Sequence, residues 1–192
     1  MAAKRNFDSE EVLDGVMRTF WSHGYRGTSL EDLARATGLR KGSLHNAFGN
    51  KEDLFLLALE RYAQLFDRRL DNALDDPDPY RAIERFLEAI VERMSDSFNP
   101  RGCLSTYACI EWQDLPPKAA AKVSHTLAGL EEQLTKIIKK GQQQSNFASD
   151  KDARSLARFL IATTRGMATL HKVTGDLDTV RDVANCAIGV LK

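Results

Sequence analysis

The sequence predicts an all-α protein with nine helices arranged in two domains. Apolar residues recur at helical spacing along nearly the whole chain, and no stretch alternates apolar and polar residues for long enough to indicate a strand. The acidic, proline-containing segment at residues 75–79 is the clearest break, because proline lacks a helical N–H donor and restricts the residue before it. We therefore expect an amino-terminal domain at residues 1–50 and a carboxy-terminal domain at residues 51–192, connected by a helix at residues 51–74.

The first two helices are short and have clear ends. An apolar stripe that runs from Val12 to Phe20 indicates the first helix, which ends at Gly24, a residue type common just after a helix. Thr28 and Ser29 stand three residues before a pair of acidic side chains, a capping pattern that begins the second helix.

The remaining helices follow from the same spacing rule. A third short helix at residues 41–48 ends at Gly49, and the connecting helix begins two residues later. Ser149 or Asp150 can cap the eighth helix. Beyond the proline-containing break, the expected helices lie at residues 80–94, 101–112, 117–141, 150–174 and 180–191.

Composition excludes several classes of protein. Basic and acidic side chains number 27 each, so the overall charge indicates no partner. Acidic residues follow the start of the chain where a secretory signal needs an apolar stretch, and the uncharged runs are about half the roughly 18 residues that indicate a membrane span. We therefore expect a cytoplasmic protein. Its three cysteines form no CxxC pair and its four histidines no HExxH pair, so we expect no metal site and no cofactor.

Residues 30–48 carry the clearest functional pattern. Two short helices joined by a glycine-containing turn fit the helix-turn-helix unit, which places its second helix in the major groove of DNA. The segment from Arg26 to Lys51 holds five basic and two acidic residues. Arginine and lysine can bind phosphates or guanine edges, serine and histidine can donate to phosphates, and asparagine can pair with adenine. The segment therefore predicts binding to double-stranded DNA.

The same segment resembles a known family. Residues 24–55 read GYRGTSLEDLARATGLRKGSLHNAFGNKEDLF, which is similar to the amino-terminal signature of the TetR family of bacterial transcriptional regulators. The similarity has no gaps and covers about residues 9–56. It implies a two-domain helical protein that forms a homodimer, represses transcription by occupying a palindromic operator, and releases DNA when its carboxy-terminal domain binds a small molecule.

The positions of the family motif imply particular DNA contacts. Thr28 corresponds to a phosphate-binding threonine, Lys51 corresponds to a phosphate-binding lysine, and Gly42 allows close approach of the backbone to DNA. His45 stands where the family usually has a phosphate-binding tyrosine, so its contact differs in reach and, because histidine can be charged near neutral pH, in charge. The expected DNA-binding residues are Arg26, Thr28, Ser29, Arg40, Lys41, Gly42, Ser43, His45, Asn46 and Lys51.

Plainer interpretations of the same residues stay open. Arg40 and Lys41 can form a solvated face without a partner, and Thr28 can serve only as a helix cap. Gly42 costs up to about 1 kcal/mol in a helix relative to alanine, so close approach of DNA gives its presence a reason.

The carboxy-terminal half carries aromatic and polarizable side chains suited to an apolar pocket that binds an unidentified small-molecule effector. Most such residues belong to the core of any helical domain, so the alternative is packing alone. The expected ligand-binding residues are Phe86, Met94, Tyr107, Cys109, Trp112, Phe159, Met167 and His171.

Cys103 offers a second mode of sensing. The Gly-Cys-Leu run at residues 102–104 resembles one recurring subset of the family. Backbone N–H groups at a helix start favour a thiolate and so raise reactivity. The hypothesis is a redox- or electrophile-sensing repressor that acts through Cys103, and its alternative is that the cysteines are small buried hydrophobes.

The last two helices are the expected dimer interface, through Phe159, Thr163, Val180, Val183, Ala187 and Val190. Two rival classes remain. The chain contains no phosphate-binding loop, nucleophile elbow or paired metal ligands, so we expect no enzyme. A helical adaptor that keeps the fold without operator binding is the second rival.

Overall fold

The computed structural model describes residues 7–192, with only the backbone of residues 67 and 68. Residues 1–6, which belong to the segment used to predict the absence of a secretory signal, lie outside this range. The described part of the chain contains nine α-helices, one short 3-10 helix (η1) and no strand, which confirms the predicted all-α class. The elements are α1 (Ser9–His23), α2 (Leu30–Thr37), α3 (Lys41–Phe48), α4 (Lys51–Leu74), α5 (Pro79–Ser95), α6 (Leu104–Ile110), η1 (Trp112–Asp114), α7 (Pro117–Gln143), α8 (Ala153–Thr174) and α9 (Leu177–Val190).

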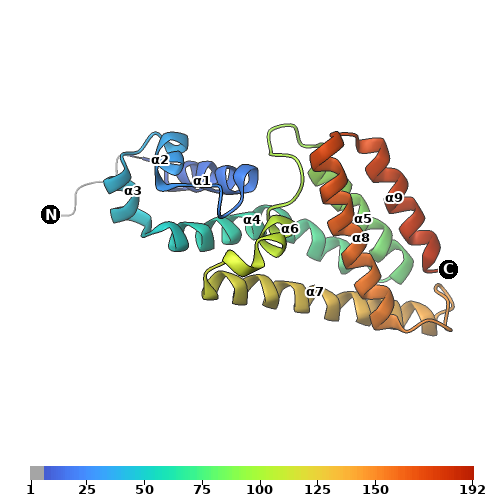
Figure 1. Cartoon of the computed structure of the whole chain (residues 1–192). Helices are drawn as coiled ribbons and strands as arrows, with labels where there is room; N and C mark the ends of the chain where they lie inside the picture. Colours follow the sequence, from blue (N-terminus) through green and yellow to red (C-terminus); the bar gives the residue numbers. More distant parts are fainter. Residues whose placement is uncertain (1–6) are drawn as a thin grey trace.

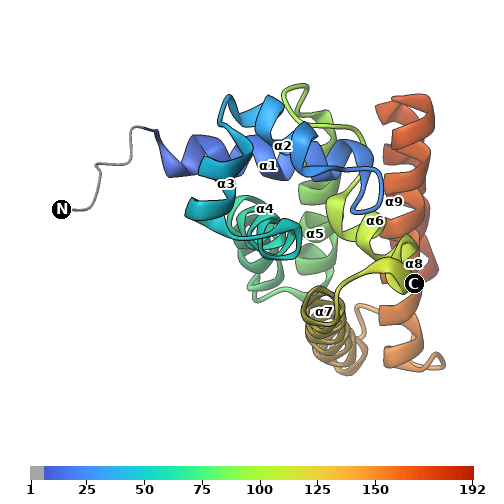
Figure 2. The same ribbon diagram turned by 60° about the vertical axis from the view of Figure 1, so that its left-hand side comes forward.

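The helices form a small group and a large group that share α4. Helices α1, α2 and α3 lie together at one end of the molecule, and α4 runs from them into the larger group (Figure 1). There α4 packs against α5 and α7, while α8 packs against α7 on one side and α9 on the other. Figure 2 shows α1 and α2 above α4, with α8 and α9 side by side at the far edge. None of the helices in the described range is long and apolar enough to cross a membrane.

Aromatic packing fixes α1 on α4. The rings of Phe20 and Phe55 meet edge to face with centroids 4.9 Å apart, and those of Trp21 and Tyr62 do so at 5.0 Å. All four side chains are at most 3% exposed. Such pairs add to the free energy gained by burying their apolar surface. The short helices are therefore held on one rigid support.

The helix starts that were predicted from nearby capping residues agree with the structure in part. Ser29 caps α2 in a reciprocal arrangement with Asp32, as its capping pattern predicted, and Asn50 caps α4 in the same way. The prediction that Ser149 or Asp150 caps the eighth helix is wrong, because the Asp152 side chain accepts from the N–H of Ser155 instead.

The sixth helix is shorter than predicted. The expected helix at residues 101–112 is limited to Leu104–Ile110. Gly102 has φ +90° and Cys103 is extended, so the helix cannot begin before them. At the other end the backbone leaves the helix at Glu111, and Trp112 belongs to η1.

Candidate nucleic-acid interface and internal cavity

Helices α2 and α3 form a helix-turn-helix with one buried side. Gly38 ends α2 in the left-handed conformation, and Lys41 begins α3. Leu33 and Leu44 are fully buried and anchor the two helices on the core. The opposite face of α3 is exposed, and it presents Arg40, Lys41, Gly42, Ser43, His45 and Asn46 together.

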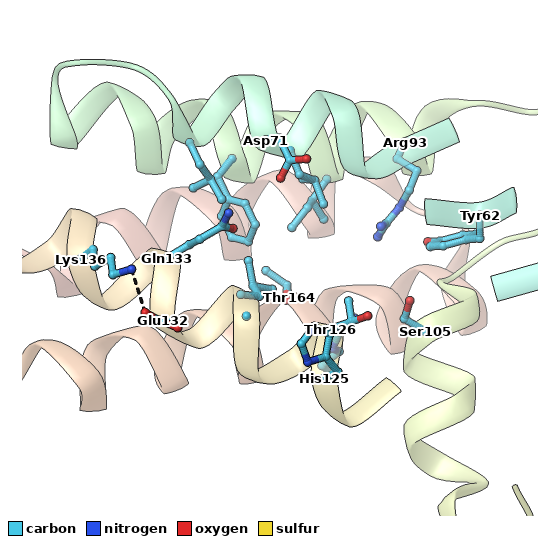
Figure 3. A pocket seen from close by; sticks show the side chains of 17 residues that line it. Tyr62, Asp71, Arg93, Ser105, His125, Thr126, Glu132, Gln133, Lys136 and Thr164 are labelled. Atoms are coloured by element: carbon cyan, nitrogen blue, oxygen red, sulfur yellow. Dashed lines mark ion pairs between the residues drawn. The ribbon is translucent and has the colours of Figure 1, made fainter. Parts of the chain in front are cut away.

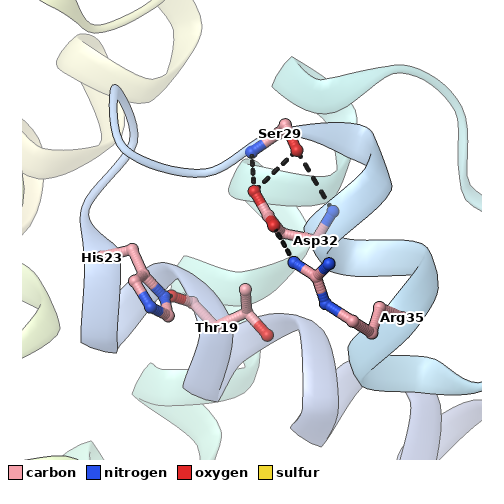
Figure 4. A network of polar contacts seen from close by, with 5 residues as sticks. All are labelled: Thr19, His23, Ser29, Asp32 and Arg35. Carbon is pink, nitrogen blue, oxygen red and sulfur yellow. Dashed lines mark hydrogen bonds and ion pairs between the residues drawn. The ribbon is translucent and has the colours of Figure 1, made fainter.

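A polar network fixes the start of α2 (Figure 4). The Ser29 hydroxyl donates to Asp32 Oδ2 at 2.6 Å and accepts from the Asp32 N–H at 3.1 Å. Hydrogen bonds from Ser29 lower the pKa of Asp32, and Arg35 forms an ion pair with the same carboxylate. Ser29 is thus exposed but already engaged as a helix cap.

Thr28 lies below the surface in this structure. It is 2% exposed, and its Oγ1 donates to the carbonyl oxygen of Gly24 at 2.7 Å. A phosphate bond donated by this hydroxyl requires that internal bond to open.

Three predicted basic residues already have partners in the structure. Arg26 forms an ion pair with Asp114 at 3.3 Å, and Lys41 forms one with Glu31. Lys51, at the start of α4, places its ammonium 4.4 Å from the centroid of the Tyr25 ring. Partial burial lowers the pKa of Lys51. Each of these three side chains would therefore exchange or share a contact within the protein when it binds a phosphate.

The loop between α1 and α2 is joined to α6 and η1. One Glu111 oxygen accepts from the Tyr25 N–H at 2.5 Å, and the other accepts from the Arg26 N–H at 3.3 Å. Lys172 of α8 adds a hydrogen bond to the Ser22 carbonyl at 3.4 Å. The amino-terminal helices are therefore tied to the larger group through side chains as well as through α4.

A cavity of about 420 Å³ lies in the larger group, among α4, α5, α6, α7 and α8. In Figure 3, Tyr62, Arg93, Ser105 and Thr126 lie toward one end, while Glu132, Gln133 and Lys136 lie toward the other. Five apolar side chains also line the cavity: Leu70, Leu74, Phe86, Ile90 and Leu130.

The structure does not bring the eight predicted ligand-binding residues into this cavity. Only Phe86 lines it, and Cys109 lines an adjoining hollow of about 70 Å³ that shares Tyr62, Ser105, Thr126 and Arg165 with the cavity. Met94 and Met167 pack in the core, where helix packing has turned them away from the cavity. The other four also lie elsewhere: Tyr107 under the Lys172 ammonium, Trp112 in η1, Phe159 on the outer face of α8, and His171 beneath Gly102.

Cys103 is buried immediately behind the cavity wall. It is 1% exposed, the Tyr62 hydroxyl donates to its Sγ at 3.2 Å, and Arg165 Nη1 lies 3.7 Å from that sulfur. Burial raises the pKa of this thiol, but the Arg93 and Arg165 guanidiniums, together with hydrogen bonds from Tyr62 and Thr106, lower it to about 6. Cys103 is therefore an anionic thiolate for much of the neutral pH range.

Sequence reasoning missed Tyr62, Arg93 and Arg165. Arg165 carried a usable signal, since it is the only charged residue in the run 159–170 of α8, whereas Arg93 directly follows Glu92 and gives no such signal. A charged side chain on the core side of an amphipathic helix needs a buried partner or a cavity.

Five of the six residues predicted for the dimer interface lie together on the outer face of α8 and α9. Phe159 and Val190 are 38% and 40% exposed, and they border an apolar hollow of about 250 Å³ with Thr163, Val183 and Ala187. Val180 does not belong to this face, because it is fully buried within its own chain.

Profiles of known protein families match both halves of the chain. The family profile described as "Bacterial regulatory proteins, tetR family" matches residues 12–58, and the one described as "Tetracyclin repressor-like, C-terminal domain" matches residues 79–187. The HTH-type transcriptional repressor ComR of Escherichia coli (strain K12) is 28% identical over 184 residues, which cover 95% of this chain and 88% of that protein. The uncharacterized HTH-type transcriptional regulator YezE of Bacillus subtilis (strain 168) is 28% identical over the full length of both chains.

Solved structures agree in fold over the full chain. A cysteine mutant of the TetR family transcriptional regulator CifR, complexed with 26-base-pair operator DNA, superposes with a TM-score of 0.87 at 27% identity and covers 100% of both chains. A regulator from Legionella pneumophila superposes with a TM-score of 0.80 at 21% identity, also over 100% of both chains, and supports the fold alone.

Proposed function

This chain belongs to the TetR family of bacterial regulatory proteins and is a DNA-binding transcriptional regulator, and on that premise we propose that it is a homodimeric repressor released from its operator by a small molecule. Residues 1–50 would bind DNA, residues 51–192 would sense the ligand and dimerise, and α4 would connect them. The chain would act by regulated binding and carry out no catalysis.

The exposed face of α3 is the observation that carries this proposal. Arg40, Lys41, Ser43, His45 and Asn46 stand on it together, above the buried Leu44. Their donors suit phosphates and base edges. Lys41 would exchange its partner Glu31 for a phosphate at little cost, because both side chains of that pair are more than half exposed and such pairs contribute little.

The remaining proposed contacts surround this face. Arg26 and Ser29 are exposed next to it, and Thr28 lies beneath them. Lys51 begins α4, where its ammonium can reach a phosphate from its position on the Tyr25 ring. Gly42 adds no side chain, so the α3 backbone can approach DNA closely.

The apolar outer face of α8 and α9 supports the proposed dimer. A palindromic operator needs two recognition helices about 34–36 Å apart or a multiple of that distance. The apolar hollow between Phe159 and Val190, with Thr163, Val183 and Ala187, would receive the same face of a second copy.

The direct test is binding to the DNA that flanks the protein's own gene, measured by fluorescence anisotropy across salt concentrations. We expect a specific complex that Lys41→Ala/Asn46→Ala weakens at least about tenfold, whereas Lys139→Ala, an exposed control on α7, leaves it unchanged. Absence of any specific complex would favour a helical adaptor. A monomer at micromolar concentration in analytical ultracentrifugation would contradict the dimer.

Cys103 supports a second candidate, a repressor that senses oxidants. Its thiolate would attack a peroxide oxygen, the O–O bond would break, hydroxide would leave, and the sulfur would be oxidised to a sulfenic acid. The low pKa of the thiol favours this step, while its burial limits access. Operator release by hydrogen peroxide should disappear in Cys103→Ser and persist in Cys186→Ser, whose cysteine is exposed. Release that survives Cys103→Ser would exclude this mechanism.

A further inference from the structure

Arg165 is a half-buried cation that forms no ion pair with any carboxylate among the described side chains. Its Nη1 lies 3.7 Å from Cys103 Sγ and 3.5 Å from Thr106 Oγ1, and its buried Nε has no hydrogen-bond acceptor among the described residues. Arg154 and Arg158, which precede it on α8, both form ion pairs with Glu131. Desolvating a guanidinium that has no carboxylate partner is costly, and the only anion that the described residues place beside Arg165 is the Cys103 thiolate.

Arg165 lines the cavity on the side of Tyr62, since both side chains contact Cys103 Sγ. We call this side the polar end. Tyr62, Arg93, Ser105 and Thr126 line that end with it, which brings two guanidiniums and three hydroxyls to one cavity (Figure 3). Both guanidiniums favour the anionic form of Cys103, and Arg165 faces the cavity as well.

Among the described residues, no acidic side chain of the lining forms an ion pair with Arg165. Glu132 is paired with Lys136 at 2.7 Å, toward the other end of the cavity. Asp71 of α4 also lines the cavity, but it forms no ion pair with Arg165. The polar end is thus suited to an anion, and the apolar wall leads away from it.

We propose that the cavity binds a small molecule with one carboxylate and an apolar body. Arg165 would bind the carboxylate, with hydrogen bonds from the hydroxyls of Ser105 and Thr126, while the Tyr62 hydroxyl stays bonded to Cys103. The apolar body would lie along Leu70, Leu74, Phe86, Ile90 and Leu130. A cavity of about 420 Å³ is within the usual size range for metabolites. The inference rests on the proposed function in one respect, since this molecule would be the effector that releases the operator.

The test is calorimetric titration of the dimer without DNA, using straight-chain carboxylates of roughly four to ten carbon atoms and their primary amides. We expect at least one carboxylate to bind, and its amide to bind at least about tenfold more weakly. Arg165→Met should remove that preference, whereas Arg158→Met should keep it. Binding of no carboxylate, equal binding of acid and amide, or a preference that survives Arg165→Met would overturn the proposal.

A second measurement does not depend on the folding of a variant at Arg165. An anion beside Arg165 disfavours a neighbouring thiolate, so a saturating carboxylate should shift the thiolate absorbance titration of Cys103, isolated by difference from Cys103→Ser, to higher pH. An unshifted titration would count against the site. Operator binding, followed in parallel by anisotropy, separates the two proposals: carboxylate binding without operator release supports this site and contradicts the effector role, whereas operator binding without carboxylate binding overturns only this site.

Discussion

The Glu111 carboxylate accepts a 2.5 Å hydrogen bond from the backbone N–H of Tyr25, 86 residues away in the sequence. Glu111 directly follows α6, a helix of seven residues that is directly preceded by Cys103. Cys103 in turn accepts from Tyr62, which lines the cavity. One short helix therefore joins the cavity wall to the loop that precedes α2.

Gly24 and Glu111 should be energetically coupled. A Cβ on Gly24 would lie 2.6 Å from Glu111 Oε1, and Gly24 has φ +75°. We expect Gly24→Ala to lower the free energy of unfolding by about 2–4 kcal/mol, from steric overlap and backbone strain together, and Glu111→Ala to lower it by about 1–3 kcal/mol. The double variant, measured by urea denaturation, should lose at least about 1 kcal/mol less than the sum, because Glu111→Ala removes the overlap. Additive losses would disprove the coupling.

Gly42→Ala should separate stability from DNA binding. A Cβ at Gly42 meets no atom within 4 Å, so alanine should stabilise the free protein by up to about 1 kcal/mol. The same methyl group would lie between α3 and DNA, and we expect operator affinity to fall about tenfold. Gly166→Ala on α8, which also meets nothing within 4 Å, is the matched control and should change stability only. Undiminished affinity in Gly42→Ala would mean that the backbone does not approach DNA closely there.

Lys51→Ala should weaken binding to every DNA sequence equally. Loss of one phosphate contact should lower the slope of log affinity against log salt by about one per protomer. The variant also loses the contact with the Tyr25 ring, which should cost about 0.5–1 kcal/mol of stability. Lys139→Ala provides the charge-matched comparison. A slope equal to that of the wild type would remove Lys51 from the phosphate contacts.

Helix ends were predictable where their cause lies within a few residues. Ser29 with Asp32 and Gly38 decide both ends of α2 by capping and by left-handed backbone. The ends of α6 depend on the backbone at Gly102 and on the long-range bonds of Glu111, so periodicity alone made this helix too long.

The cavity was less predictable than the DNA-binding face. The exposed side of α3 follows from a single buried anchor, Leu44, because the helix has only eight residues. The cavity, in contrast, lies among five helices, α4 to α8. Their packing decides which aromatic and methionine side chains face it. Met94 and Met167 fit the composition of a pocket but lie in the core, while Arg165 breaks an apolar stripe and lies in the cavity wall.

Cys103 should make stability depend on pH with a definite sign. Its folded-state pKa of about 6 lies below the ordinary thiol value of about 8.5. Between these values the unfolded chain binds more protons at this group than the folded chain does, so the free energy of unfolding rises with pH. The contribution, up to about 3 kcal/mol, is fully present above about pH 8.5 and is lost as the pH falls through about 6.

Urea denaturation at several pH values tests this dependence. Cys103→Ser should flatten the rise between about pH 6 and 8.5, because serine does not ionise there. Cys109→Ser is the control, since burial raises the pKa of Cys109, the opposite direction from Cys103. An equal rise in wild type and Cys103→Ser would mean that the thiol is not ionised in the folded protein. In that case Arg165 would lack even a thiolate as a counter-ion, and the need for an anion in the cavity would be greater.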